Sequence, residues 1–139
     1  MSNMNDFVIK DGVLVNYLGF DTEIEIPDTV TKIGDYVFQS SFSLVSVKMG
    51  NVVTTIGESA FYGCTSLTSI DIPDSVVTVD GDAFYDCNSL KEVGISDASV
   101  GVIETALGAK LVRDGDKWRI EGWISTDQKS PSTFAGFSF

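Results

Sequence analysis

A repeat of 23 residues constrains this chain more than any other feature of its sequence. Similar segments begin at Ile24, Val47 and Ile70, so each starts 23 residues after the one before. Further columns of apolar residues keep the same spacing without an insertion: Ile33, Ile56, Val79 and Val102; Phe38, Phe61, Phe84 and Leu107; Leu44, Leu67 and Leu90. A unit this short cannot bury its own apolar side chains, so consecutive units stack and equivalent residues form ladders. The sequence therefore predicts a solenoid with three full units and a partial fourth.

Each unit is expected to open on a short strand. Ile24 and Ile26 alternate with Glu23 and Glu25, which is the period that points one set inward and the other outward. Proline lacks an amide hydrogen, so Pro27 closes the strand. Residues 58–64 have helix-like spacing over one turn, which predicts a short helical or 3₁₀ turn on the outer side. The Phe column is interpreted as core rather than as an aromatic ligand site.

Hairpins are predicted at both ends, where a solenoid needs a cover for its open face. Residues 7–10 and 13–18 flank Asp11-Gly12, a strong hairpin signal. Residues 111–113 and 117–123 flank a second turn sequence, Asp-Gly-Asp. Both hairpins therefore act as caps in the predicted fold.

A helix is predicted between the repeats and the second hairpin. Ser96 or Asp97 is expected to cap it, Gly108 to end it, and its apolar side to be formed by Val100, Ile103 and Leu107. The chain then forms one domain with four parts, namely an N-terminal hairpin cap (1–22), repeats with the start of a fourth (23–95), a helix and hairpin cap (96–129) and a tail (130–139).

The repeat resembles a known family at its best-preserved segments. Ile70-Asp-Ile-Pro-Asp-Ser-Val76, and Ala60-Phe61 with its following Cys64 and Leu67, are similar to the BspA-like leucine-rich repeats of bacterial surface proteins. The resemblance covers roughly residues 20–107. It implies an α/β repeat fold, a short right-handed leucine-rich repeat solenoid with parallel strands on the concave face. It also implies a place at the cell surface or in secretion. Residues 1–10 hold no apolar run long enough for an export signal, so a cytoplasmic place is the alternative.

Composition excludes several classes of function. The chain has no histidine, so Ser-His-Asp triads and His-ligated zinc sites are impossible. Its net charge of −11 opposes binding to nucleic acid or anionic membrane, and no apolar run is long enough to insert into a bilayer. Cys64 and Cys87 share a column close enough for a disulfide, but stacked parallel side chains favour free buried thiols. We expect no catalytic residue, no metal and no cofactor.

The acidic residues are the remaining functional signal. Glu23, Glu25, Asp71 and Glu92 fall on outward strand positions, and we expect them to bind a protein partner with a basic surface. Solvated charge that only keeps the chain soluble explains the same residues. The leading hypothesis is a non-catalytic interaction or adhesion module. The alternatives are a structural spacer or display module without a ligand and, less favoured, a carboxylate-based glycoside hydrolase.

Overall fold

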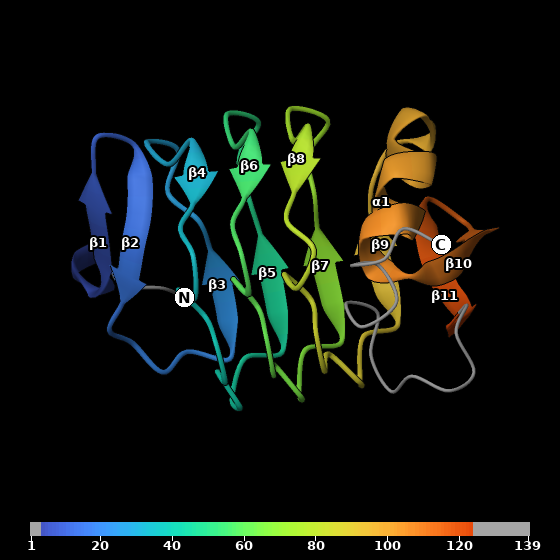
Figure 1. Cartoon of the computed structure of the whole chain (residues 1–139), viewed down its shortest axis with the longest axis horizontal. Coiled ribbons are helices and arrows are strands. Elements are labelled where there is room, and N and C mark those ends of the chain that lie inside the picture. The colour runs from blue at the N-terminus through green and yellow to red at the C-terminus, as the bar shows by residue number, and fades with distance from the viewer. Residues whose placement is uncertain (1–3, 124–139) are drawn as a thin grey trace.

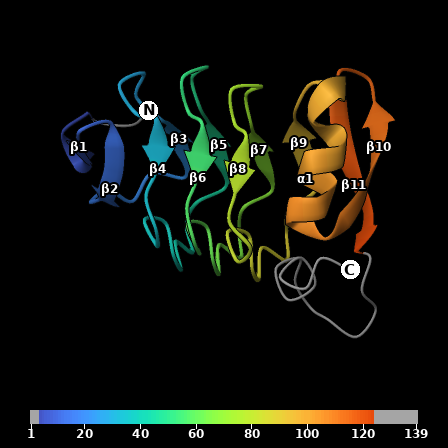
Figure 2. The ribbon, with the colours of Figure 1, turned by 45° about the horizontal axis from the view of Figure 1, so that its top comes forward.

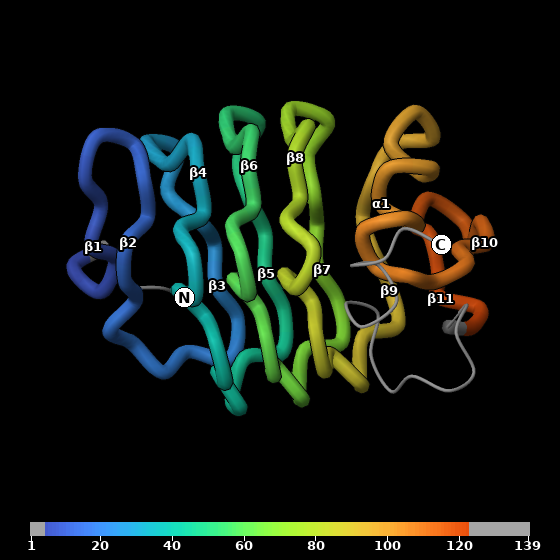
Figure 3. The backbone as a smooth tube through the Cα atoms, in the orientation of Figure 1, coloured from blue at the N-terminus to red at the C-terminus, as the bar shows by residue number. Residues whose placement is uncertain are grey.

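Each full repeat unit forms one coil of a solenoid and contributes one strand to each of two sheets (Figure 1). The computed structural model describes residues 4–123. After a 3₁₀ turn, η1 (Met4–Asp6), the repeats hold β3 (Glu23–Glu25), β4 (Lys32–Ile33), β5 (Ser46–Lys48), β6 (Thr55–Ile56), β7 (Ser69–Asp71), β8 (Thr78–Val79) and β9 (Glu92–Gly94). The smooth trace in Figure 3 follows these coils from one end of the molecule to the other.

The larger sheet is built from the predicted parallel strands. Its order is β10-β11-β9-β7-β5-β3, and β3, β5, β7 and β9 are parallel neighbours. Their register is that of the repeat, because Ile24 pairs with Val47, Val47 with Ile70, and Ile70 with Val93. The sequence spacing therefore predicted the strand pairing correctly.

A second sheet lies opposite the first and was not predicted (Figure 2). Its order is β1-β2-β4-β6-β8, with the hairpin of β1 (Phe7–Lys10) and β2 (Val13–Tyr17) at one end. The repeat strands in it are two residues long, too short to show alternation in sequence. Only the aliphatic column beginning at Ile33 marked their place.

The predicted helical turn over residues 58–64 is wrong. This segment is a series of turns, in which Ser59 and Gly63 have φ values of 53° and 74°. A residue in the left-handed region breaks a right-handed helical path, so no helix continues through it. Ser40 and Asp86, one repeat before and after Gly63, also have positive φ, so the turn recurs in each coil.

Stacked phenylalanines form the centre of the core, as predicted. Phe38 and Phe61 have ring centroids 5.2 Å apart, and Phe61 and Phe84 have centroids 5.4 Å apart with nearly parallel planes. All three side chains are fully buried. Tyr17 of the N-terminal hairpin lies on the first ring at 5.5 Å, so the hairpin extends the ladder and covers its end.

The C-terminal cap has the predicted elements but a different helix start. A 3₁₀ turn, η2 (Asp97–Ser99), leads into α1 (Val100–Leu107), which ends at Gly108 with φ of 67°. Neither Ser96 nor Asp97 caps α1 with its side chain, because the Asp97 carboxylate instead pairs with Arg113. The hairpin of β10 (Ala109–Asp114) and β11 (Lys117–Trp123) then joins the larger sheet through β9.

The apolar side of α1 is the predicted one. Ile103 and Leu107 are buried, and Val100 is partly buried against the core. The predicted tail, residues 130–139, lies outside the described residues.

Candidate functional site

The outer side of the larger sheet carries the residues predicted to bind a partner. Ile24, Val47, Ile70 and Val93 point into the core and are buried, so the residues on either side of each point outward. We call this surface the charged face. Its side chains are Glu23, Glu25, Ser46, Lys48, Ser69, Asp71 and Glu92 of the parallel strands, with Lys117 and Arg119 of β11.

The strand register arranges these side chains in two columns. One column is Glu23, Ser46, Ser69 and Glu92, and the other is Glu25, Lys48, Asp71 and Gly94. All four predicted residues lie on this one face. Neighbouring strands are about 4.8 Å apart, so Glu23 and Glu92 are separated by roughly 14 Å. The four acids therefore share a surface but do not converge on a point.

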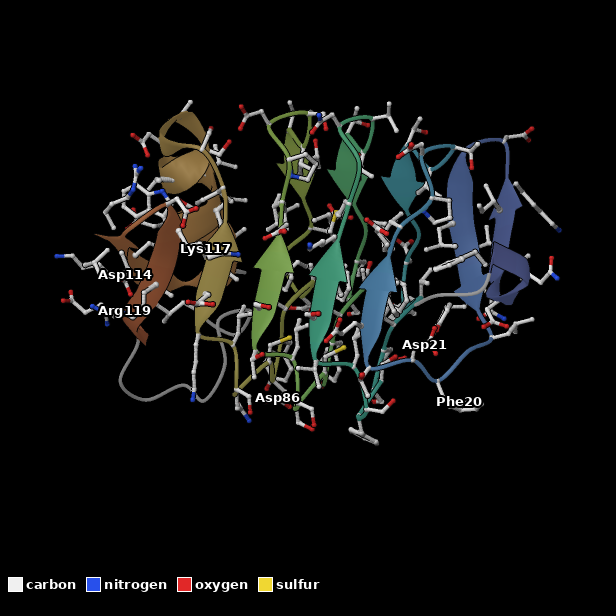
Figure 4. The ribbon with its side chains drawn as sticks, turned by 180° about the vertical axis from the view of Figure 1, so that it is seen from behind. Phe20, Asp21, Asp86, Asp114, Lys117 and Arg119 are labelled. Carbon is white, nitrogen blue, oxygen red and sulfur yellow. The ribbon has the colours of Figure 1, made fainter. Side chains whose placement is uncertain are left out.

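Basic residues divide this surface, and only Lys48 among them was placed there by the repeat. Lys48 lies between Glu25 and Asp71 in their column. The Lys117 ammonium lies 3.7 Å from the Asp71 carboxylate, and Arg119 lies 3.7 Å from Asp114. Figure 4 shows Lys117, Asp114 and Arg119 on the C-terminal hairpin beside the strands. The C-terminal end of the charged face is therefore mixed in charge.

Gly94 makes room for the ion pair between Asp71 and Lys117. A Cβ atom at this position would lie 2.1 Å from the Asp71 carboxylate oxygen. Because Gly94 has no side chain, Lys117 reaches over β9 to the next strand. Both partners are more than a third exposed, so the pair contributes between about 0 and 1 kcal/mol to stability.

Two shallow grooves follow the ends of the parallel strands. One of about 710 Å³ is lined by Asp71, Asp74, Asp116 and Lys117, and one of about 630 Å³ by Glu25, Asp28, Lys48 and Asp71. These grooves bring carboxylates together, as a hydrolase would require. A carboxyl group that acts as a general acid needs a desolvated site, whereas every acid here is at least partly exposed. The geometry fits surface recognition better than acid catalysis.

The aromatic side chains on the turn side form a smaller cluster. The Tyr62 and Tyr85 rings are stacked with centroids 4.7 Å apart, and both residues are half-buried. The stacking covers one face of each ring, which leaves less of these tyrosines for an outside ligand.

Two exposed phenylalanines were missed by the sequence analysis. Phe20 is 88% exposed and Phe42 is 63% exposed, and both line a cavity of about 410 Å³ in the first coil. Phe20 is labelled at the N-terminal end of the solenoid in Figure 4. The sequence did contain a signal. One repeat later the equivalent positions hold the small polar residues Ser43 and Thr65, so a phenylalanine at these positions falls outside the core ladders.

The two cysteines are structural. Both are buried and free, and their thiols donate hydrogen bonds to the Phe38 and Phe61 carbonyl oxygens at 3.0 and 3.1 Å. Burial raises the pKa of the Cys64 thiol to about 12 and raises the pKa of Cys87 as well. A thiol with a raised pKa is a poor nucleophile at neutral pH.

Comparison with known sequences identifies the repeat. Residues 16–107 match a family described as BspA type leucine rich repeat region, in six copies. No curated protein matches the chain.

Two solved structures are similar to the chain. The T. pallidum leucine-rich repeat protein is 30% identical with a TM-score of 0.63, over 68% of this chain and 49% of that one. A leucine rich cell surface protein from Faecalibacterium prausnitzii A2-165 is 30% identical with a TM-score of 0.51, over 73% of this chain and 32% of that one. The chain thus spans about half the length of the first and about a third of the second. Among the described residues, no helix has the length and apolar character needed to cross a membrane.

Proposed function

Because the chain belongs to the BspA-type leucine-rich repeat family, we propose that it is a non-catalytic module that binds a protein partner through the charged face. The observation that carries this proposal is the register of the parallel strands. It places exposed charged side chains from neighbouring coils on one continuous surface, and a partner could contact several coils at once. The Faecalibacterium relative is a cell surface protein, which supports a similar location for this chain.

Acidic residues lie beside basic residues along the whole length of the charged face. Glu23 and Glu25 lie together on β3, at the end of the sheet farthest from the C-terminal hairpin. At the other end, Asp71 is paired with Lys117, and Arg119 lies beside Glu92 in the strand register. Lys48 lies beside Glu25 in the same way, so a partner with a basic surface should depend on all four acids, Glu23, Glu25, Asp71 and Glu92. Opposite charges steer association, and salt screens them.

The test compares capture of partners by the full chain and by three variants. Biotinylated protein is used to capture partners from bacterial and host-cell extracts at low and high salt. We expect Glu23→Ser/Glu25→Ser and Asp71→Ser/Glu92→Ser each to lose captured partner. Exposed substitutions usually change stability by no more than about 0.5 kcal/mol, so all variants should fold.

The control removes two acids from a different surface. Asp80→Ser/Asp82→Ser, on the turn side after β8, changes the net charge by the same amount and should capture the partner normally. If the Glu23→Ser/Glu25→Ser variant captured the same partner equally well at both salt concentrations, the charged face would be ruled out.

A spacer or display module is the alternative, and the position of β3 favours it. This strand is the outermost of the larger sheet, and charged side chains on an edge strand prevent unwanted pairing with another chain. Glu23 and Glu25 would then keep the solenoid soluble and monomeric without binding a partner. In that case their substitution should increase self-association, measured by analytical ultracentrifugation, and leave no captured partner to lose.

A further inference from the structure

The smaller sheet ends abruptly at β8. Within the described residues this strand pairs with β6 alone, and its other edge has no neighbouring strand. The larger sheet instead continues beyond the third coil through β9, β11 and β10. Among the described residues, the larger sheet therefore ends at β10, whereas the smaller sheet ends at β8, beside the helix.

The repeat identifies the hydrogen-bonding groups on that edge. In the first coil, the carbonyl groups of Thr31 and Ile33 accept hydrogen bonds from the next coil, at 2.8 and 2.9 Å. In the second coil, the carbonyls of Thr54 and Ile56 do the same, at 2.9 and 3.0 Å. The equivalent carbonyls of the third coil belong to Val77 and Val79. Because the hydrogen bonds between coils repeat, these two carbonyls point away from β6, toward the position that a sixth strand of the smaller sheet would take.

The fourth unit forms helix α1 instead of such a strand, and α1 lies across a groove from β8. Val100 and Val102, one repeat after Val77 and Val79, lie in the helix rather than in a strand. A groove of about 720 Å³ separates α1 from β8. It is lined by Val77, Thr78 and Val79 from the strand side and by Gly101, Val102 and Thr105 from the helix side.

The lining of this groove differs from the rest of the surface. The described residues that line it carry no charge, in a chain with a net charge of −11. Val77 is 73% exposed and Val102 is 52% exposed. Gly101 has open space where a side chain would be, so the helix lets another backbone approach closely.

We propose that the groove between β8 and α1 binds an extended, uncharged segment of a partner protein, which adds to β8 as a sixth parallel strand. The open carbonyl groups select an extended backbone, because a helix has no free amide row to offer them. Because the residues that line the groove carry no charge, an uncharged segment fits it best. A charged side chain would lose hydration in this groove without gaining a partner, whereas a basic segment finds its counterparts on the charged face.

This site is independent of the proposed function. The charged face recognises by electrostatic attraction and should weaken with salt. Strand addition depends on backbone hydrogen bonds and apolar contact, which persist at about 1 M salt, where charges more than about 3 Å apart are screened. An experiment at high salt can therefore refute one proposal without refuting the other.

The experiment selects peptides of about six residues, the usual length of a strand, from a phage-displayed library on the immobilised full chain at about 1 M NaCl. We expect uncharged sequences rich in β-branched residues. Gly101→Leu fills the groove and should weaken their binding on the order of tenfold or more. Gly122→Leu adds the same side chain to open space on β11 and should leave binding unchanged. Glu23→Ser/Glu25→Ser should also leave it unchanged.

A second measurement does not depend on any variant. Each selected peptide is made in two forms, N-methylated at alternate amides, so that one form loses the donors facing β8 and the other loses those facing away. We expect only one of the two forms to lose binding. Failure to select such peptides, equal binding by Gly101→Leu, or equal binding of both N-methylated forms would overturn the proposal.

Two other occupants of the groove are also distinguished by this design. Concentration-dependent dimerisation of the full chain that Gly101→Leu abolishes would assign the groove to a second copy. Peptide binding that strengthens when Phe134, Phe137 and Phe139 are replaced by Ser would assign it to the chain's own C-terminal residues. Either result would refute a partner segment as the occupant.

Discussion

The phenylalanine ladder allows a quantitative test of the solenoid core. Phe61 is fully buried and has a stacked ring on each side, with centroids 5.2 and 5.4 Å away. Replacing a buried Phe with Ala costs about 3–5 kcal/mol because a cavity remains. Each stacked pair adds roughly 0.5–1.5 kcal/mol beyond the buried area. Both neighbouring rings are held by their own coils, so the cavity has little freedom to collapse. We expect Phe61→Ala to cost about 5 kcal/mol.

This loss is large compared with the stability of a typical domain, about 5–15 kcal/mol. Urea unfolding followed by far-ultraviolet circular dichroism measures it through the transition midpoint. Phe20→Ala is the matched control, because Phe20 is 88% exposed and should change stability by no more than about 0.5 kcal/mol. If Phe61→Ala and Phe20→Ala had the same midpoint, the stacked ladder would not be the core of the fold.

Four further predictions follow from the thiols and the C-terminal cap. Cys64 and Cys87 should resist alkylation in the folded protein and both react after unfolding without reductant, as mass spectrometry would show; one or no label would contradict free thiols. Burial raises the pKa of the Cys64 thiol from 9.0 to about 12 in the folded protein, so the folded state is fully stable below pH 9 and loses stability as the pH rises toward 12. Urea midpoints that fall across this pH range would support this, and rising midpoints would contradict it. Deleting residues 109–139 should expose the buried Ile103 and Leu107 and cause aggregation, so a truncated chain as monomeric and heat-stable as the full one would disprove the cap. Gly108→Ala should cost about 1 kcal/mol in thermal unfolding because Gly108 has φ of 67°, and an unchanged melting temperature would show that the helix end is not strained.

The candidate site was only partly predictable from sequence. The alternation around Ile24 and Ile70 correctly placed Glu23, Glu25 and Asp71 on the outward side of their strands. The pairing of Asp71 with Lys117 was not predictable, because Lys117 comes from a hairpin outside the repeat. The repeat spacing relates only repeated residues to one another. The neighbours of Lys117 are therefore fixed by how the C-terminal hairpin packs on the last coil.

The helix start shows the same limit at shorter range. Ser96 and Asp97 have the residue types of an N-cap, and local propensity favours them there. In the structure the chain first forms η2, and the Asp97 carboxylate pairs with the guanidinium of Arg113 on β10. A tertiary ion pair thus replaced the local hydrogen bond that the sequence suggested.

The sequence by itself determined the repeating part of this protein. In a solenoid each side chain meets its own equivalent one repeat later, so a linear spacing of 23 residues specifies the strand register and the Phe38, Phe61 and Phe84 ladder. The tertiary structure alone decided the features that arise where the repeat stops. The edge of β8 is open because no repeated strand follows it. The groove beside α1 and the salt bridge across Gly94 both bring repeated residues against non-repeated ones. Such contacts depend on how the cap packs in three dimensions, for which the period of the sequence carries no information.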